Sequence, residues 1–356
     1  MLRKHVIAYT VFLVLAASAP MLVGEGIVRL LTEAFLMLVM AQMWNLLAGY
    51  AGLVSMGHQV FVAIGAYALF ATSVMLGISP YWALPAAPLV CALVAAPIAI
   101  PLFRLRDAYF SIGMWVFAEI IAAIVTKSAW LGGTGGMPLS TSKMLDFDWF
   151  EPIVFWIAAV LMAATIGGLH LLMNSRFGLG LMSVRDNDLA ATSIGVDVQH
   201  NRFVAFVISA AGCGLAGALS FLGSLFVTPA PAFDPTWCVN MLFIVIIGGI
   251  GTLEGPIIGT FVFFALREAI TDGLGLSASW YLVTLGTAAV ATMLFAPRGL
   301  WPLLRDRIGL EPLSVRRRPP PRVAIAEAHD IIHALPAAPN AAGAGKTQSA
   351  ARGARN

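Results

Sequence analysis

Residues 46–67 read LLAGYAGLVSMGHQVFVAIGAY, an apolar stretch without a charged side chain that is interrupted by four glycines and by Ser55, His58 and Gln59. Such a stretch predicts helices within a lipid bilayer, because a membrane span needs about 20 mostly apolar residues. Glycine in a membrane helix serves either close helix packing or local unwinding of the backbone. The glycines and polar residues therefore indicate a turn or a broken helix at this point.

The composition of the whole chain supports a membrane protein. Of its 356 residues, 59% are hydrophobic and 11% are charged, whereas about 25% of the residues of a soluble domain are charged. Only helices and closed barrels satisfy the backbone in lipid, and barrel strands are short alternating segments of about ten residues. The long unbroken apolar runs therefore predict an all-α, polytopic transmembrane protein.

The hydropathy pattern predicts about ten spans. The basic head and apolar body of the first span are also typical of a signal peptide, but a second span follows within a few residues, so we expect an uncleaved helix. Residues 238–270 are too long for one straight helix and are divided at GGIGTLEGP. The predicted spans are 6–23, 29–49, 59–77, 82–103, 108–127, 151–173, 202–227, 238–250, 256–270 and 279–297.

The distribution of positive charge predicts the orientation of these spans. With ten spans and a cytoplasmic N-terminus, the C-terminus is cytoplasmic as well. The outer segments then keep only Arg29, Lys127, Lys143 and Arg267 of the 21 Lys and Arg residues, which is the expected excess of positive charge on the inner side. Tryptophans, which favour membrane interfaces, fall at the predicted outer boundaries: Trp82, Trp130, Trp149, Trp237 and Trp280.

Residues 1–301 are predicted to form the membrane domain, and residues 302–356 form a basic, Pro- and Ala-rich tail. The tail holds nine Lys and Arg against four Asp and Glu, and its composition cannot build a core, so we expect it to be disordered and cytoplasmic. Its GAGKTQS stretch lacks the first glycine of a phosphate-binding loop, because Asn340 stands there. The sequence therefore predicts no ATPase site. Cys91, Cys213 and Cys238 show no metal or disulfide spacing.

The largest inner loop, residues 174–201, contains a short helix in DNDLAATSIG. Asp186 can accept hydrogen bonds from the first free amides, Asp188 favours the helix dipole, and Gly195 can end the helix in a left-handed conformation. Two turns are not stable alone. The helix is therefore either a connection that lies on its own protein or a peg, exposing Leu189 and Ile194, that fits a cleft on a cytoplasmic partner.

Six segments together resemble the permease subunits of branched-chain amino acid ABC importers, of the LivH/LivM inner-membrane family and most closely its LivM type. They occur in the same order over roughly residues 30–301. The segments are WNLLAGYAGLVSMGHQVFVAIGAY (44–67), RLRDAYFSIGMWVFAEI (104–120), GGTGGM (132–137), SRFGLGLMSVRDNDLAATSIGVDVQHNRFVAFVISAAGCGLAGAL (175–219), GGIGTLEGPIIG (248–259) and APRGLW (296–301).

The resemblance implies an ABC importer permease fold in the bacterial inner membrane. It also implies two ATPase subunits, which bind ATP and Mg²⁺ outside this chain, a second homologous permease and a periplasmic solute-binding protein; no partner is a nucleic acid. The implied substrates are branched-chain or similar small amino acids, although relatives carry urea, short amides or aromatic acids. The 174–201 loop would then hold the coupling helix, with docking residues Arg176, Arg185, Asp186, Asp188, Leu189, Ala190, Ala191, Ile194 and Gly195.

Residues 49–58 and 248–255 are expected to be two flexible inner corners that let the spans tilt. We expect His58 to hydrogen-bond the backbone at its corner, because it has no second metal ligand at helical spacing. Gly65, in mid-span, predicts a close helix contact. The predicted hinge and gate residues are Gly49, Gly52, Ser55, Gly57, His58, Gly249, Gly251, Glu254 and Gly255.

The transport pathway is expected to involve Glu119, Gln59 and Trp115. An ionisable residue inside a span indicates function, so Glu119 either contacts the substrate ammonium, lines the pathway or satisfies a neighbouring helix end. Gln59 and Trp115 stand where the family pattern has other residues. Two alternatives remain: an ion-coupled carrier that uses Glu119, and a membrane-embedded enzyme. The enzyme would need paired Asp or His residues near one membrane interface, and the sequence shows no such cluster.

Overall fold

The computed structural model describes residue 20 and residues 23–105, 108–273, 278–296 and 299–308. Apart from residues 20 and 23, the predicted first span lies outside the described residues, and so does all of the predicted tail beyond residue 308. The described part is helical apart from one antiparallel pair of two-residue strands, β1 (Met137–Pro138) and β2 (Phe226–Val227). The prediction of an all-α protein is confirmed.

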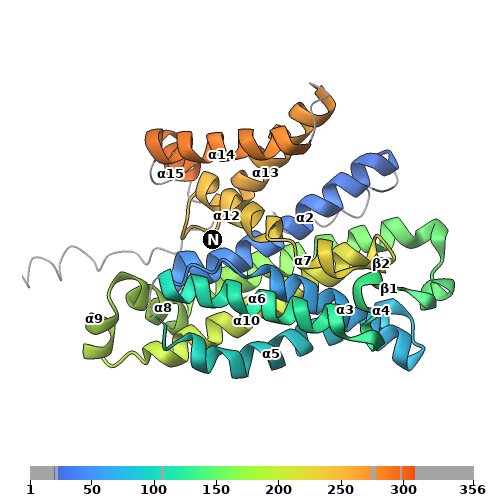
Figure 1. Cartoon of the computed structure of the whole chain (residues 1–356). Helices are drawn as coiled ribbons and strands as arrows, with labels where there is room; N and C mark the ends of the chain where they lie inside the picture. Colours follow the sequence, from blue (N-terminus) through green and yellow to red (C-terminus); the bar gives the residue numbers. More distant parts are fainter. Residues whose placement is uncertain (1–19, 21–22, 106–107, 274–277, 297–298, 309–356) are drawn as a thin grey trace, which may run out of the picture. The chain divides into compact units, whose positions relative to one another are not determined.

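Figure 1 shows the order of the elements. The longer helices are α2 (Glu25–Asn45), α3 (Gln59–Leu76), α5 (Ala86–Leu102), α6 (Ala108–Lys127), α7 (Phe147–Asn174), α10 (Val198–Leu222) and α14 (Ala278–Phe295). The shorter ones are α4 (Pro80–Ala83), α8 (Arg176–Asp186), α9 (Asp188–Ser193), α11 (Pro229–Ala232), α12 (Thr236–Gly248), α13 (Gly255–Glu268) and α15 (Leu300–Ile308). Two π-helical turns, η1 (Leu46–Tyr50) and η5 (Ala269–Gly273), extend α2 and α13, and the 129–144 loop holds three 3-10 turns, η2 (Ala129–Leu131), η3 (Gly133–Gly135) and η4 (Ser140–Met144).

Among the described residues, seven helical segments are long and apolar enough to cross a membrane, and Trp280–Phe295 is a shorter apolar helix. The described helices therefore account for only part of the ten predicted spans. Helix α12 attains span length together with α11, as Pro229–Gly248, and α13 has only 14 residues. The break between α12 and α13 lies at the predicted GGIGTLEGP division, because Gly249 and Gly251 have positive φ, which favours glycine.

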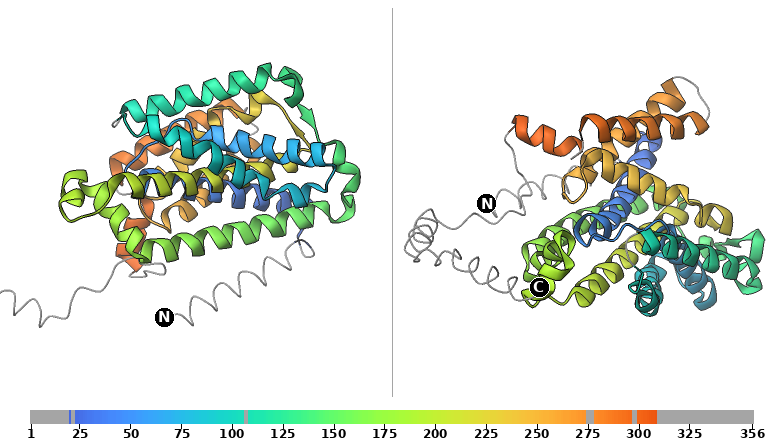
Figure 2. Two further views of the ribbon diagram at one scale, coloured as in Figure 1. Left: turned by 90° about the horizontal axis from the view of Figure 1, so that it is seen from below. Right: turned by 60° about the vertical axis from the view of Figure 1, so that its left-hand side comes forward.

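Helix α10 packs against α3, α5 and α2, and α10, α3 and α5 lie side by side in Figure 1. Figure 2 shows the helices from two further directions. The close contact predicted for Gly65 is confirmed: a Cβ there would collide with the carbonyl of Gly214 on α10. Small residues at such crossings let membrane helices approach, since lipid supplies little hydrophobic force between them.

The 25 residues of α10 separate two ends of the helix bundle. At a rise of about 1.5 Å per residue these ends lie ~37 Å apart, which matches the thickness of a bilayer. Helix α9 joins the start of α10, and we call this side the α9 end. Strand β2 follows the end of α10 and marks the opposite end.

Candidate functional site

The chain turns at the α9 end through two short helices with well-defined caps. The Asn187 side chain accepts hydrogen bonds from the amides of Leu189 and Ala190, at 3.0 and 3.1 Å, and so caps α9. Asp186 was expected to be this cap, and that prediction is wrong: Asp186 ends α8. Asparagine is as good an N-cap as aspartate, so the sequence alone did not distinguish the two residues. Gly195, with φ +84°, ends the turn as predicted.

Helix α9 is held on the bundle from one side. Asp188 forms an ion pair with Arg202 on α10 at 2.9 Å, and the Ala191 side chain is buried, at 1% exposure. Leu189 and Ile194 are 81% and 74% exposed. The short helix therefore has the support that its length requires, and it presents an apolar surface that nothing in the described residues covers.

The other predicted docking residues divide between two faces. Ala190 is exposed beside Leu189, whereas Ala191 faces the bundle and cannot contact a partner in this arrangement. Arg176 is exposed at the start of α8, ten residues before Asp186, so it lies ~15 Å along that helix from α9. We define the α9 face as Leu189, Ala190 and Ile194.

Arg185, the penultimate residue of α8, links this region to the first predicted corner. Its Nη1 donates a hydrogen bond to the carbonyl oxygen of Gly49 at 3.0 Å. Its Nη2 lies 3.0 Å from Oδ1 of Asp186. The predicted docking loop, 174–201, and the first predicted corner, 49–58, are therefore in direct contact.

The two predicted corners, 49–58 and 248–255, form one packed junction. The Asn45 side chain accepts a hydrogen bond from the Gly251 amide at 2.9 Å and donates to the Thr252 carbonyl at 2.8 Å. Gln42 donates to the Leu253 carbonyl at 2.7 Å. A Cβ at Gly49 would lie 2.5 Å from the Gly251 nitrogen, so only glycine allows this approach. We call Asn45, Gly49, Gly251, Thr252 and Arg185 the inner junction.

The remaining hinge residues surround the inner junction. Gly52 turns the chain with φ +72°, and Gly57 packs against the Met114 carbonyl on α6. Gly249 also has positive φ, and Gly255 begins α13 after Glu254. The sequence had indicated each corner separately, but it carried no signal that Asn45 and Arg185 tie them together, because these residues are 206 and 136 positions from their partners.

His58 is a buried structural residue. Its Nε2 lies 2.8 Å from the Ser209 hydroxyl and its Nδ1 lies 3.3 Å from the Ser55 hydroxyl. The expected bond to the backbone is therefore wrong; two serine side chains take that place. Through Ser209 the His58 side chain holds the start of α3 against α10.

Ser55 and Gln59 are as completely buried as His58, at 0% exposure. The Ser55 carbonyl accepts a hydrogen bond from Trp44 Nε1 at 2.8 Å. Gln59 is buried, whereas the other two predicted pathway residues are exposed. Trp115 and Glu119 lie together on the exposed side of α6, with Trp115 Nε1 3.2 Å from Glu119 Oε1.

Long apolar helices, an interior packed through glycines and a short capped helix at one end define a multi-pass membrane protein. Among the described residues, no group of three His, Cys, Asp or Glu side chains could hold a metal ion. The chain matches the family described as "Branched-chain amino acid transport system / permease component" over residues 26–294. It therefore belongs to this family, and it is a permease component of a branched-chain amino acid ABC transport system rather than an ATPase.

Several curated relatives agree with this assignment. The chain is 26% identical to the "High-affinity branched-chain amino acid transport system permease protein LivM" of Escherichia coli strain K12, covering 86% of this chain and 77% of that protein. It is also 26% identical to LivM of Salmonella typhimurium, over 84% and 75%. A "Probable branched-chain amino acid transport permease protein LivH" of Methanocaldococcus jannaschii is 25% identical, over 67% and 80%. No solved structure matches the chain.

Proposed function

We propose that this chain is a permease subunit that moves branched-chain or similar small amino acids across the bacterial inner membrane. Two separate ATPase subunits drive it from the cytoplasmic side, a periplasmic solute-binding protein delivers the ligand, and a second homologous permease completes the pathway. The α9 end is then cytoplasmic, as the positive charge pattern predicted. The observation that carries the proposal is the α9 face, two large apolar side chains held in place but uncovered.

The inner junction supports a route from the ATPases to the spans. Exposed apolar side chains on a short rigid helix are suited to a cleft on a partner protein. A force on α9 reaches α8 directly, and Arg185 on α8 bonds the Gly49 carbonyl. Gly49 contacts Gly251, so α2 and the α12–α13 break would move together. In this mechanism the chain is a gate without chemistry of its own.

The exposure of helix α6 supports a transport pathway along this helix. It is the least buried of the seven candidate spans, and Trp115 and Glu119 lie on its exposed side. A carboxylate that faces lipid at mid-span costs about 2.5–3.5 kcal/mol. This cost favours coverage of the face by the second permease, with Glu119 at the edge of a pathway between the two chains.

Co-purification tests the docking proposal. Tagged protein extracted in mild detergent is expected to retain both ATPases, and Leu189→Arg or Ala190→Arg is expected to release them. Ala129→Arg places the same side chain at an exposed alanine of the opposite end and is the matched control. Ala191→Arg is unsuitable, because Ala191 is buried and the variant would disturb the fold. Retention of both ATPases by Leu189→Arg and Ala190→Arg would contradict the proposal.

Uptake in proteoliposomes tests the energy source and the substrate. We expect leucine accumulation that requires internal ATP and continues when an uncoupler removes the proton gradient. Accumulation by this chain alone, or its collapse with the uncoupler at constant ATP, would instead favour an ion-coupled carrier. Competition by urea, a short amide or an aromatic acid, in place of leucine, would reassign the substrate and leave the permease role intact.

A further inference from the structure

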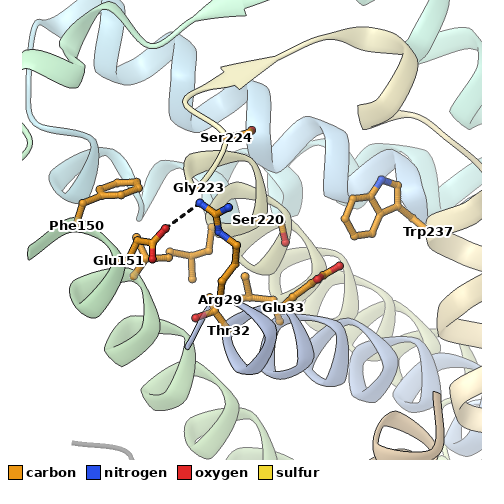
Figure 3. Close-up of a pocket in the computed structure, with 12 residues that line it drawn as sticks. Arg29, Thr32, Glu33, Phe150, Glu151, Ser220, Gly223, Ser224 and Trp237 are labelled. Atoms are coloured by element: carbon orange, nitrogen blue, oxygen red, sulfur yellow. Dashed lines mark hydrogen bonds and ion pairs between the residues drawn. The ribbon is translucent and has the colours of Figure 1, made fainter. Parts of the chain in front are cut away.

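A pocket of about 430 Å³ lies at the end of the bundle opposite α9 (Figure 3). It is formed where the first turns of α2 and α7 meet the end of α10 and the start of α12. Its volume is within the range of about 300–1,000 Å³ that is typical of small-molecule sites. Leu36, Val154 and Leu219 form a buried apolar wall, and Phe150 and Trp237 add aromatic surface.

One ion pair crosses this pocket. Figure 3 shows Arg29 of α2 pointing toward Glu151 of α7, with Nη2 2.8 Å from Oε1. The Arg29 side chain is 75% exposed and the Glu151 side chain 34%. Such a solvent-exposed pair contributes about 0.2–1 kcal/mol. A ligand can therefore replace one partner of the pair at little cost.

The second acid of the pocket, Glu33, is already neutralised. Its two carboxylate oxygens accept hydrogen bonds from Nη1 and Nη2 of Arg267, at 2.7 and 2.9 Å. Arg267 also stacks over the Phe264 ring, 4.6 Å from the centroid. A two-pronged bond of this kind is stronger and more directional than a single contact. Glu33 and Arg267 therefore remain paired, and Arg29 and Glu151 are the groups that exchange.

Hydroxyl groups on the pocket wall have acceptor capacity to spare. Thr32 donates to the Val28 carbonyl at 2.8 Å and Ser220 to the Ala216 carbonyl at 3.0 Å. Because each hydroxyl donates its single hydrogen to its own helix, it is left only with lone pairs, which can accept a hydrogen bond from a ligand. Acceptors next to a carboxylate suit an ammonium group.

We propose that this pocket binds a zwitterionic amino acid with an apolar side chain. The ligand's carboxylate pairs with the guanidinium of Arg29. Its ammonium group pairs with Glu151 and donates hydrogen bonds to the wall hydroxyls, and its side chain packs on the apolar wall. The proposal rests on the proposed function, because this amino acid would be the transported one.

Charge balance favours a zwitterion over a simple acid or amine. A zwitterion replaces one ion pair with two charge-assisted contacts and leaves no charge without a partner. A carboxylic acid alone would pair with Arg29 and leave Glu151 without a partner. An amine alone would pair with Glu151 and leave Arg29 without a partner. An acid or an amine therefore only exchanges one ionic contact for another, whereas a zwitterion gains a second contact. The pocket is therefore expected to require both the carboxylate and the ammonium.

Direct binding tests this requirement. The purified transporter in nanodiscs, without its solute-binding protein, is incubated with radiolabelled leucine. We expect saturable binding that unlabelled leucine displaces, but not 4-methylpentanoate, which lacks the ammonium, or isoamylamine, which lacks the carboxylate. Arg29→Gln and Glu151→Gln are expected to weaken binding at least tenfold. Lys127→Gln removes an exposed cation at the end of α6 and is expected to bind as the unchanged protein does.

Protection of a cysteine locates the ligand. Ser224 lines the pocket and is exposed, whereas Cys91, Cys213 and Cys238 are all buried. A maleimide is therefore expected to label Ser224→Cys with little background, and leucine is expected to slow this labelling. Ser140→Cys, in the exposed loop before α7, is the control that leucine does not protect. Unchanged labelling of Ser224→Cys at saturating leucine, or full binding by Arg29→Gln, would overturn the proposal.

Parallel measurement of ATP-driven uptake separates the two proposals. Leucine uptake without protection of Ser224→Cys would leave the transport function standing and remove the pocket. Protection without any amino acid uptake would support the pocket and contradict the transport function. A pocket filled by another segment or by a partner chain would leave Ser224→Cys unlabelled from the start, which also counts against the pocket.

Discussion

Arg185 donates a hydrogen bond from Nη1 to the carbonyl oxygen of Gly49 at 3.0 Å, joining two residues that are 136 positions apart. Gly49 lies in the π-helical turn that ends α2, and Arg185 lies just before the cap of α9. The bond is partly buried and charge-assisted. It is the direct link between the α9 face and the packed corners of the spans.

Removal of this link should uncouple transport from ATP hydrolysis. Hydrogen bonds to charged groups contribute about 1.5–3 kcal/mol, and ~1.4 kcal/mol corresponds to a tenfold change in an equilibrium. We expect Arg185→Gln to lower leucine uptake roughly tenfold while both ATPases still co-purify and hydrolyse ATP. Arg176→Gln, at the other end of α8, should leave uptake unchanged. Loss of the ATPases from Arg185→Gln would show that Arg185 serves docking instead.

The approach of Gly49 to Gly251 should make the inner junction intolerant of a methyl group. A Cβ at Gly49 would lie 2.5 Å from the Gly251 nitrogen, and overpacking of this kind costs about 1–3 kcal/mol. We expect Gly49→Ala to lower the melting temperature of the detergent-solubilised protein. Gly168→Ala, on α7 with open space around it, should melt at the same temperature or higher, because alanine favours a helix. Equal melting of the two variants would argue against tight packing here.

The cap of α9 distinguishes the observed structure from the sequence-based expectation. Loss of an N-cap costs about 1 kcal/mol of stability, and α9 is a helix of only six residues. Hydrogen exchange of the 190–196 amides should therefore be roughly fivefold faster in Asn187→Ala. Asp186→Asn should exchange at the original rate. Faster exchange in Asp186→Asn alone would restore Asp186 as the cap.

The exposed side of α6 should contact the second permease. A photo-cross-linking amino acid at Val116, which is 53% exposed on α6, is expected to give a covalent product with that subunit. Val160, 57% exposed on α7, is the matched position and should give mainly lipid adducts. Preferential cross-linking at Val160 would move the interface to α7 and remove Glu119 from the pathway. Mass spectrometry of the products identifies the partner.

The helices could be predicted from the sequence because the signal is local. Membrane spans follow from runs of apolar residues, and the division at GGIGTLEGP follows from glycines that favour positive φ. The helix in the 174–201 loop was recognisable for the same reason, since its polar cap and terminal glycine are neighbours in sequence. The choice between Asp186 and Asn187 as the cap was not, because both residue types accept the same hydrogen bonds.

The sequence by itself determined the membrane class, the family segments and the glycines that make corners. Only the tertiary structure decided that the two corners are one junction, that Ala191 faces inward while Leu189 faces out, and that Arg29 meets Glu151 across a pocket. Each of these relationships depends on contacts between parts of the chain that are far apart in sequence. They depend on how helices cross, and helix crossing is set by the packing of many side chains at once rather than by any local pattern.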